Sequence, residues 1–178
     1  MSVMLSSSRL QVADLVGRPG ASRPLDVQLA PPPGLDLPLA TVLGSVRVVG
    51  VIESVVEGLL VRGELMARLQ AACARCLDPV QIQLAPPVVE LFEEPDKAVE
   101  ELDEGYELLH EELDLDMLVR DTLATAVPTR ILCDADCAGL CATCGQALDQ
   151  AECGCGDEAA DPRWAPLRAL ELSEPAEY

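Results

Sequence analysis

The chain has 178 residues, of which 12 are lysine or arginine and 31 are aspartate or glutamate, so its formal net charge is −19. This charge speaks against a general nucleic-acid binder, because such proteins usually present a basic face to phosphate. The first residues show no basic region followed by an apolar run, so we expect no secretory signal. No apolar run approaches the roughly 20 residues of a membrane span, so we expect a cytoplasmic protein whose clustered cysteines bind metal.

Residues 1–92 read mainly as β-strands. A short helical turn is predicted over residues 10–16, followed by strands over 25–29 and 46–52. The clearest periodicity runs from Leu60 to Ala72, where polar and apolar side chains alternate as in a long antiparallel strand with one wet face. Further strands are predicted over residues 80–84 and 88–92, with a bend at Pro86 and Pro87 between them.

The acids gather in the second half of the chain. Residues 90–121 hold fourteen acids against Lys97 and Arg120, whereas residues 1–80 hold seven acids and seven arginines. Residues 93–112 are therefore predicted to form an acidic loop, from which residues 106–109 re-enter the sheet. An acidic surface of this kind repels RNA and attracts basic proteins. The alternative is that the acids only keep the protein soluble.

An amphipathic helix is predicted over residues 114–127. Its apolar stripe is expected to pack on the sheet face that Val61, Leu65 and Leu69 present, and Asp114 or Asp116 caps its start. The stripe consists of Leu115, Leu118, Val119, Thr122, Leu123 and Ala126. Pro128 ends the helix. The only histidine, His110, lies beside acids and is expected to be solvated rather than a metal ligand.

These elements predict an α+β fold, in which an antiparallel, strongly curved β-sheet packs against one main helix. We expect a sheet domain over residues 1–128, with the acidic loop 93–112 and the helix 114–127. A cysteine-rich metal-binding extension, residues 129–178, is expected to pack on this domain as a C-terminal zinc knuckle.

The eight cysteines are the candidate metal ligands. They are Cys73, Cys76, Cys133, Cys137, Cys141, Cys144, Cys153 and Cys155. A Cys-x-x-Cys turn points two thiolates at one ion, and tetrahedral zinc takes four such ligands. Cys141-Ala-Thr-Cys144-Gly145 is the strongest signal, because Gly145 gives a permissive backbone whose amides donate to the sulfurs.

The pairs predict two structural zinc ions, one bound by the first four cysteines in the chain and one by the last four. The first site would clamp the tail to a hairpin of the sheet, and the second would form a terminal knuckle. A different partition, such as Cys137 with Cys141, stays open, as do iron–sulfur ligation and unligated thiols.

The chain resembles the YceD family of large ribosomal RNA subunit accumulation proteins. The resemblance covers roughly residues 45–170 and rests on four motifs, which are Cys73-Ala-Arg-Cys-Leu-Asp-Pro79, Cys133-x-x-x-Cys-x-Gly-Leu-Cys-x-x-Cys-Gly145, Cys153-Gly-Cys155 and Asp161-Pro-Arg-Trp-Ala-Pro-Leu167. It implies a non-enzymatic factor that large-subunit ribosomal RNA needs in order to accumulate.

The leading hypothesis is a factor in large-subunit biogenesis that binds a basic ribosomal protein or a precursor particle through its acidic surface. The alternative is a zinc-knuckle protein that contacts RNA directly through Arg75, Arg130, Arg163 and Trp164. An enzyme is not expected, because four-cysteine zinc sites are closed and the first Cys-x-x-Cys pair follows a strand rather than starting a helix. No small-molecule substrate and no membrane contact are expected.

Overall fold

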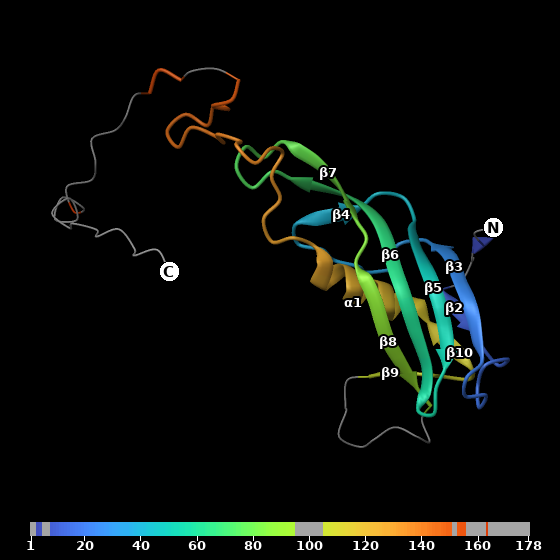
Figure 1. The fold of residues 1–178 in the computed structure, drawn as a ribbon. Coiled ribbons are helices and arrows are strands. Elements are labelled where there is room, and N and C mark those ends of the chain that lie inside the picture. Colours follow the sequence, from blue (N-terminus) through green and yellow to red (C-terminus); the bar gives the residue numbers. More distant parts are fainter. Residues whose placement is uncertain (1–2, 5–7, 95–104, 151–152, 156–162, 164–178) are drawn as a thin grey trace, which may run out of the picture.

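The structure is a computed structural model that describes residues 3–4, 8–94, 105–150, 153–155 and 163. Its main sheet is built around a long central strand, β6 (Gly58–Ala72). The first half of β6 lies between β5 (Val46–Ser54) and β8 (Pro87–Glu93), and the second half lies between β4 (Ala40–Val42) and β7 (Pro79–Leu84). Figure 1 shows this exchange of neighbours along β6.

The outer strands of the main sheet are β3, β1 and β9. β3 (Ser22–Leu29) pairs with β5, β1 (Val3–Met4) pairs with β3, and β9 (Tyr106–Glu107) pairs with β8. β1 and β9 run parallel to their partners, while all other pairs among the described strands are antiparallel. The sheet, predicted as antiparallel, is thus mixed at both ends. Its strong curvature stays a prediction.

A second sheet pairs β2 (Arg9–Gln11) with β10 (Glu112–Asp114), and α1 (Leu115–Ala126) follows directly. Asp114 caps the helix, since its Oδ1 accepts a hydrogen bond from the Asp116 amide at 3.0 Å. Leu115, Leu118, Val119 and Leu123 are buried, whereas Thr122 and Ala126 are only half-buried. The predicted stripe is therefore the packed face, with Thr122 and Ala126 at its margin.

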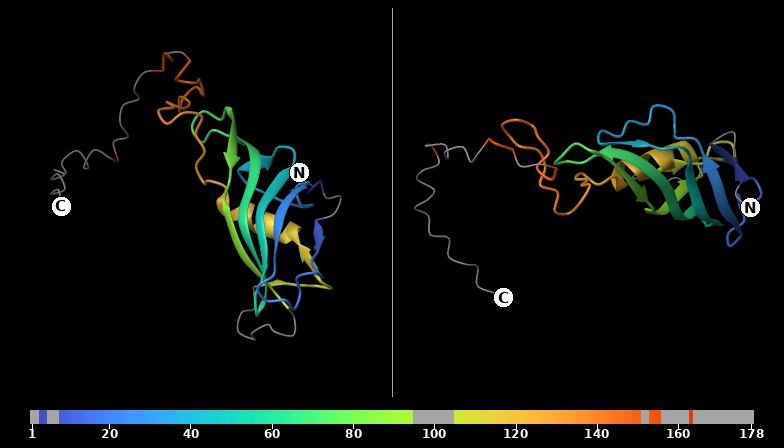
Figure 2. Two further views of the ribbon diagram at one scale, coloured as in Figure 1. Left: turned by 45° about the vertical axis from the view of Figure 1, so that its right-hand side comes forward. Right: turned by 90° about the horizontal axis from the view of Figure 1, so that it is seen from above.

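One hydrophobic core joins α1 to the sheet. Figures 1 and 2 show the helix lying across one face of the sheet. The alternation along β6 places Val61, Leu65 and Leu69 in this core, as predicted, and leaves Arg62 and Glu64 exposed. At the far edge, the Tyr106 hydroxyl donates to Asp121 Oδ2 at 2.9 Å and the Tyr106 ring stacks on Phe92, which ties β9 to both the helix and the sheet.

Two stretches differ from the sequence prediction. Residues 10–16 contain the end of β2 and a single turn in which Leu15 and Val16 donate to the Val12 carbonyl, so the helical turn is correct only in its second part. Parts of 93–112 belong to β8, β9 and β10, so the described ends of this range are not loop throughout. Residues 95–104 lie outside the described residues. Among the described residues, no helix is long and apolar enough to cross a membrane.

Candidate metal centre

The structure gathers the thiols into two groups of four. The first group, Cys73, Cys76, Cys133 and Cys137, is called site 1 here, and the second, Cys141, Cys144, Cys153 and Cys155, is called site 2. In each group the four sulfur atoms lie within 4.8 Å of one another. This is the grouping that the pairing argument predicts, and the described parts of the chain show no mixing of the two sets. Metal binding itself stays a prediction.

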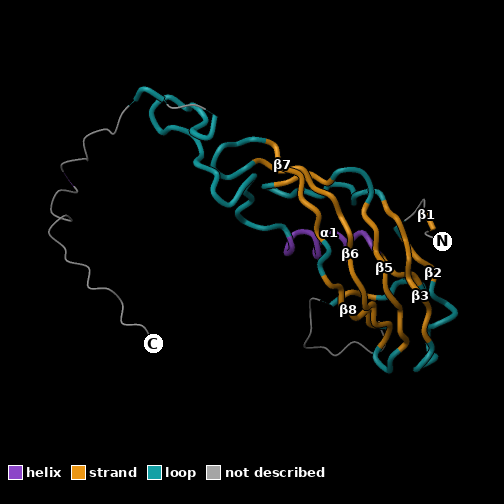
Figure 3. Tube along the Cα trace, turned by 45° about the horizontal axis from the view of Figure 1, so that its top comes forward, coloured by secondary structure: helices purple, strands orange, loops and turns teal. Residues whose placement is uncertain are grey.

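Site 1 joins the hairpin between β6 and β7 to the segment that follows α1. Cys73, Cys76 and Cys137 are buried, while Cys133 is exposed, and Val80, Leu132 and Leu140 pack around the buried thiols. Figure 3 shows that the described segment after α1 is loop alone. The thiols of site 1 thus come from two chain segments that regular secondary structure does not connect.

The sulfur spacing of site 1 fits zinc. Zinc–sulfur bonds of about 2.3 Å in a tetrahedron put the sulfur atoms about 3.8 Å apart. Cys73 Sγ lies 3.9 Å from Cys137 Sγ, and Cys76 Sγ lies 3.5 Å from Cys133 Sγ. Four thiolates would fill the tetrahedron and leave no open position for a substrate.

The two Cys-x-x-Cys turns have the same backbone geometry. The amide of Leu77 donates to the Cys73 carbonyl at 3.0 Å, and the amide of Gly145 donates to the Cys141 carbonyl at 2.8 Å. The backbone amide of the first cysteine also donates a hydrogen bond in each turn. The Cys73 amide donates to the Asp78 carbonyl and the Cys141 amide to the Gln146 carbonyl, both at 2.8 Å. The residue after each pair has a positive φ, 65° at Leu77 and 74° at Gly145.

These turns direct amides at the first thiol of each pair. The backbone amide of Cys76 lowers the pKa of the Cys73 thiol to about 6, with a further hydrogen bond from Arg75, whose amide lies 3.4 Å from Cys73 Sγ. In the same way the amides of Cys144 and Thr143 lower the pKa of Cys141 to about 6. Both turns thus favour the thiolate, which is the form that binds zinc.

Three of the other thiols, those of Cys76, Cys137 and Cys155, have raised pKa values and are shifted toward the neutral form. Burial raises the pKa of Cys137, and the neighbouring Cys133 thiol adds to this. A hydrogen bond to Cys144 raises the pKa of Cys155 to about 12. Neighbouring thiols oppose one another's ionisation, because several negative charges cannot lie so close together without a cation.

Backbone contacts fix site 1 to its surroundings. Arg75 Nη1 donates to the carbonyls of Cys137 at 2.6 Å and Ala135 at 3.3 Å, and the Ala74 amide donates to the Ile131 carbonyl at 2.7 Å. Sequence reasoning missed both contacts, and it considered Arg75 only as a possible RNA contact. Leu77 was also missed, because nothing in its chemistry signals a left-handed backbone.

Asp149 closes the segment that lies between the two sites. Its carboxylate oxygens accept the Ala138 amide, each at 3.1 Å, and the Leu148 amide donates to the Gly139 carbonyl at 2.9 Å. Residues 138–150 therefore close on themselves between Cys137 and the second pair of site 2.

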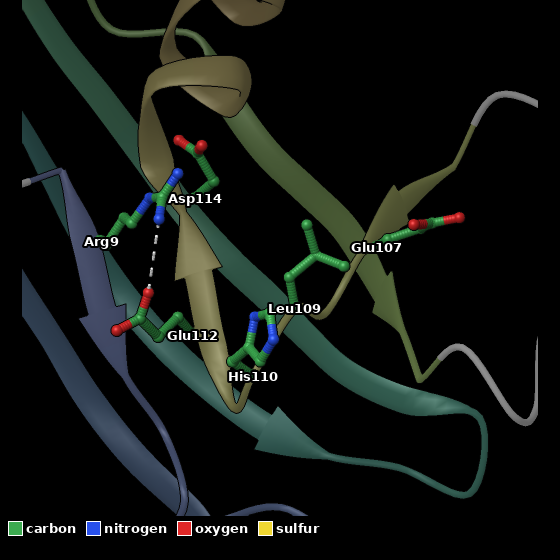
Figure 4. A pocket seen from close by; sticks show the side chains of 6 residues that line it. All are labelled: Arg9, Glu107, Leu109, His110, Glu112 and Asp114. Atoms are coloured by element: carbon green, nitrogen blue, oxygen red, sulfur yellow. Dashed lines mark ion pairs between the residues drawn. The ribbon is translucent and has the colours of Figure 1, made fainter.

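His110 is exposed and belongs to neither thiol group. It lines a hollow of about 220 Å³ on the turn into β10, where Arg9 Nη1 lies 3.9 Å from Glu112 Oε2. Figure 4 shows His110 at the tip of this turn, beside Leu109. Glu107, Glu112 and Asp114 also line this hollow, but among the described residues their ligand atoms do not gather with His110 into a group of three or more.

The chain is similar to known proteins over most of its length. The family model described as large ribosomal RNA subunit accumulation protein YceD matches residues 61–171. An uncharacterized protein of Mycobacterium tuberculosis is 36% identical over 167 residues, which cover 91% of this chain and 80% of that protein. The chloroplastic large ribosomal RNA subunit accumulation protein YCED homolog 1 of Arabidopsis thaliana is 34% identical over 59 residues, covering 33% of this chain and 18% of that protein. No solved structure matches the chain.

Proposed function

Because this chain belongs to the YceD family of large ribosomal RNA subunit accumulation proteins, we propose that it is a non-enzymatic factor in large-subunit biogenesis. It acts by binding a basic ribosomal protein, free or on a precursor particle, and large-subunit ribosomal RNA accumulates as a consequence. Two zinc ions, one in each thiol group, have a structural role.

The charge distribution carries this proposal. With 31 acidic and 12 basic residues, the chain attracts basic proteins and repels the phosphate backbone of RNA. Ten of the acids lie within residues 93–112, where Lys97 is the only basic residue. A segment with this charge speeds the capture of a basic protein, with an affinity that falls as salt screens the charges.

The geometry of the thiol groups supports a structural rather than a catalytic role for the metal. Four sulfurs within 4.8 Å of one another could complete a tetrahedron around one zinc ion, which would leave no position for a reacting water. The direct RNA-binding alternative loses one of its four contacts, because the guanidinium of Arg75 is engaged with the carbonyls of Ala135 and Cys137.

The test is a binding assay between the purified full chain and individual purified large-subunit ribosomal proteins. We expect at least one basic ribosomal protein to bind at about 0.1 M salt and to dissociate near 1 M, where the Debye length falls from about 10 to about 3 Å. A purified ribosomal RNA fragment is measured in parallel. Tighter binding of the RNA than of every ribosomal protein would overturn the proposal.

A quadruple variant locates the binding segment. Replacing Glu100, Glu101, Asp103 and Glu104 by glutamine or asparagine is expected to weaken ribosomal-protein capture about tenfold or more, with little change in melting temperature. The matched control neutralises four acids of the tail instead, Asp157, Glu158, Glu171 and Glu174, and thereby removes the same charge from another segment. Equal losses in both variants would mean that only net charge matters.

A further inference from the structure

β7 has an open and unprotected edge. Over all six of its residues, β7 pairs with β6 on one side and with no described strand on the other. Natural edge strands are usually protected by charged residues, proline or bulges. The part of β3 that lies beyond its pairing with β1 carries Arg23, Pro24 and Asp26, but β7 has no charged residue and has proline only at its first position.

The hydrogen-bond register shows which groups face this edge. The Cys73 amide donates to the Asp78 carbonyl and the Leu65 amide to the Pro86 carbonyl, and both pairs continue the β6–β7 register. Because hydrogen-bonded pairs alternate in an antiparallel ladder, Val80, Ile82 and Leu84 bond to β6. The amides and carbonyls of Gln81 and Gln83 therefore point to the open edge.

The apolar face of β7 is also incompletely covered. Val80, Ile82 and Leu84 are each half-buried. Ile82 and Leu84 pack against the main core, and Val80 packs against the buried thiols of site 1. One more strand along β7 would extend the sheet where apolar side chains are still partly exposed.

The charge at one end of β7 indicates the occupant. A hollow of about 490 Å³ opens beside Asp78, which directly precedes β7, and four aspartates line it, Asp78, Asp134, Asp136 and Asp149. None of its described lining residues is lysine or arginine. A second copy of β7 paired antiparallel would bring uncharged residues 84–86 to this hollow and leave its charge uncompensated.

We propose that the open edge of β7 binds an extended segment of a basic protein by antiparallel strand addition, with lysine or arginine side chains at the segment's C-terminal end entering the aspartate-lined hollow. This rests on the proposed function, since it places the basic partner on a defined strand. Main-chain hydrogen bonds to Gln81 and Gln83 give affinity, and the hollow gives direction.

Two double variants separate backbone from side-chain binding. Gln81→Pro with Gln83→Pro removes both outward amides and keeps the bonds to β6, whereas Gln81→Ala with Gln83→Ala removes only side chains. The probe is a labelled synthetic peptide of six alternating valines and threonines followed by four lysines. We expect the proline variant to bind it about tenfold more weakly and the alanine variant within about twofold. Equal binding by the wild type and the proline variant would overturn the inference.

Peptide variants test the same edge without altering the protein. N-methylation of one alternate set of peptide amides is expected to abolish binding, and methylation of the other set is expected to preserve it. Tight binding by both methylated peptides would exclude strand addition. This test uses the wild-type protein, so it holds even if the proline variant fails to fold.

Direction and occupant are tested next. A peptide with its four lysines at the N-terminal end is expected to bind severalfold more weakly. The protein variant Asp78→Asn with Asp136→Asn is expected to weaken binding of the original peptide to a similar extent. Stronger binding of the reversed peptide would overturn the antiparallel arrangement. A wild-type dimer that the proline variant converts to a monomer would identify a second copy as the occupant and overturn the basic partner.

Ribosomal-protein capture distinguishes the two proposals. If the proline variant captures the same ribosomal proteins as the wild type, the edge inference fails and the proposed function stands. If the wild type captures none and still binds the peptide, the proposed function fails and the edge stands as a binding site.

Discussion

Leu77 and Gly145 occupy equivalent positions in the two Cys-x-x-Cys turns. Both have a positive φ, and both donate their amide to the carbonyl of the first cysteine of the pair. Glycine adopts this backbone freely, whereas an L-residue with a side chain does so at a cost of roughly 1–2 kcal/mol. The leucine side chain is 66% exposed, so burial recovers little of this cost.

We therefore expect Leu77→Gly to leave the fold intact and to raise the free energy of unfolding by up to about 1 kcal/mol. The reason is that the relief of left-handed strain in the folded protein exceeds the entropy that glycine adds to the unfolded chain. Chemical denaturation of the zinc-loaded protein measures this. The reciprocal control, Gly145→Leu, places a side chain where only glycine is unstrained and should lower stability. A loss of stability in Leu77→Gly would show that the exposed leucine makes a contact of its own.

A glycine pair permits the close approach of β5 and β6. Gly50 lies opposite Gly63, and a Cβ on Gly63 would lie 2.1 Å from the Val49 carbonyl oxygen. A Cβ on Gly50 would lie 2.0 Å from the Arg62 carbonyl oxygen. The small residue that the sequence places at position 63 is thus required by the backbone of the neighbouring strand.

Gly63→Ala is expected to lower the free energy of unfolding by about 3 kcal/mol, because β5 and β6 must separate to admit the methyl group. The control is Gly105→Ala, where the nearest atom to the added Cβ is Glu93 Oε2 at 4.0 Å, and its effect should stay within about 0.5 kcal/mol. Thermal or chemical unfolding compares the two variants. Similar small effects in both would mean that the strands adjust without cost.

The elements that the sequence predicts well are those with a long local period. β6 and α1 each show one, and both occur close to the predicted ranges. β10 was missed because Glu112, Leu113 and Asp114 form a strand only through their pairing with β2, about one hundred residues away. The turn before it places His110 and Glu111 at positive φ, where glycine or asparagine is the usual signal.

At the scale of the whole molecule, one thiol group stands at the junction of sheet and tail, and the other lies within the tail. Their grouping follows from the pairwise spacing in the sequence, because each Cys-x-x-Cys turn contributes two ligands and eight thiols divide into two sets. The contacts of Arg75 with the carbonyls of Ala135 and Cys137 were not predictable, since they join residues about sixty positions apart without any local pattern.

The two groups predict two zinc ions per chain. Elemental analysis of the purified protein should give a zinc-to-protein ratio close to two, and a chelator should lower the melting temperature as the metal leaves. A ratio of one would mean that only one group binds metal. Iron in place of zinc would identify iron–sulfur ligation by the same cysteines.

The two sites differ in what their loss should do to the fold. Cys76 is buried in site 1, where the β6–β7 hairpin meets the tail, whereas Cys153 lies in site 2 and is half-exposed. Structural zinc contributes on the order of 10 kcal/mol of apparent binding energy in small modules, so a lost ligand removes a large part of what holds its segment. Cys76→Ser should therefore lower the melting temperature of the whole chain, while Cys153→Ser should release one zinc and leave the main transition nearly unchanged. Thermal unfolding and zinc content, measured on both variants, decide the matter, and equal losses of melting temperature would show that site 2 also supports the sheet.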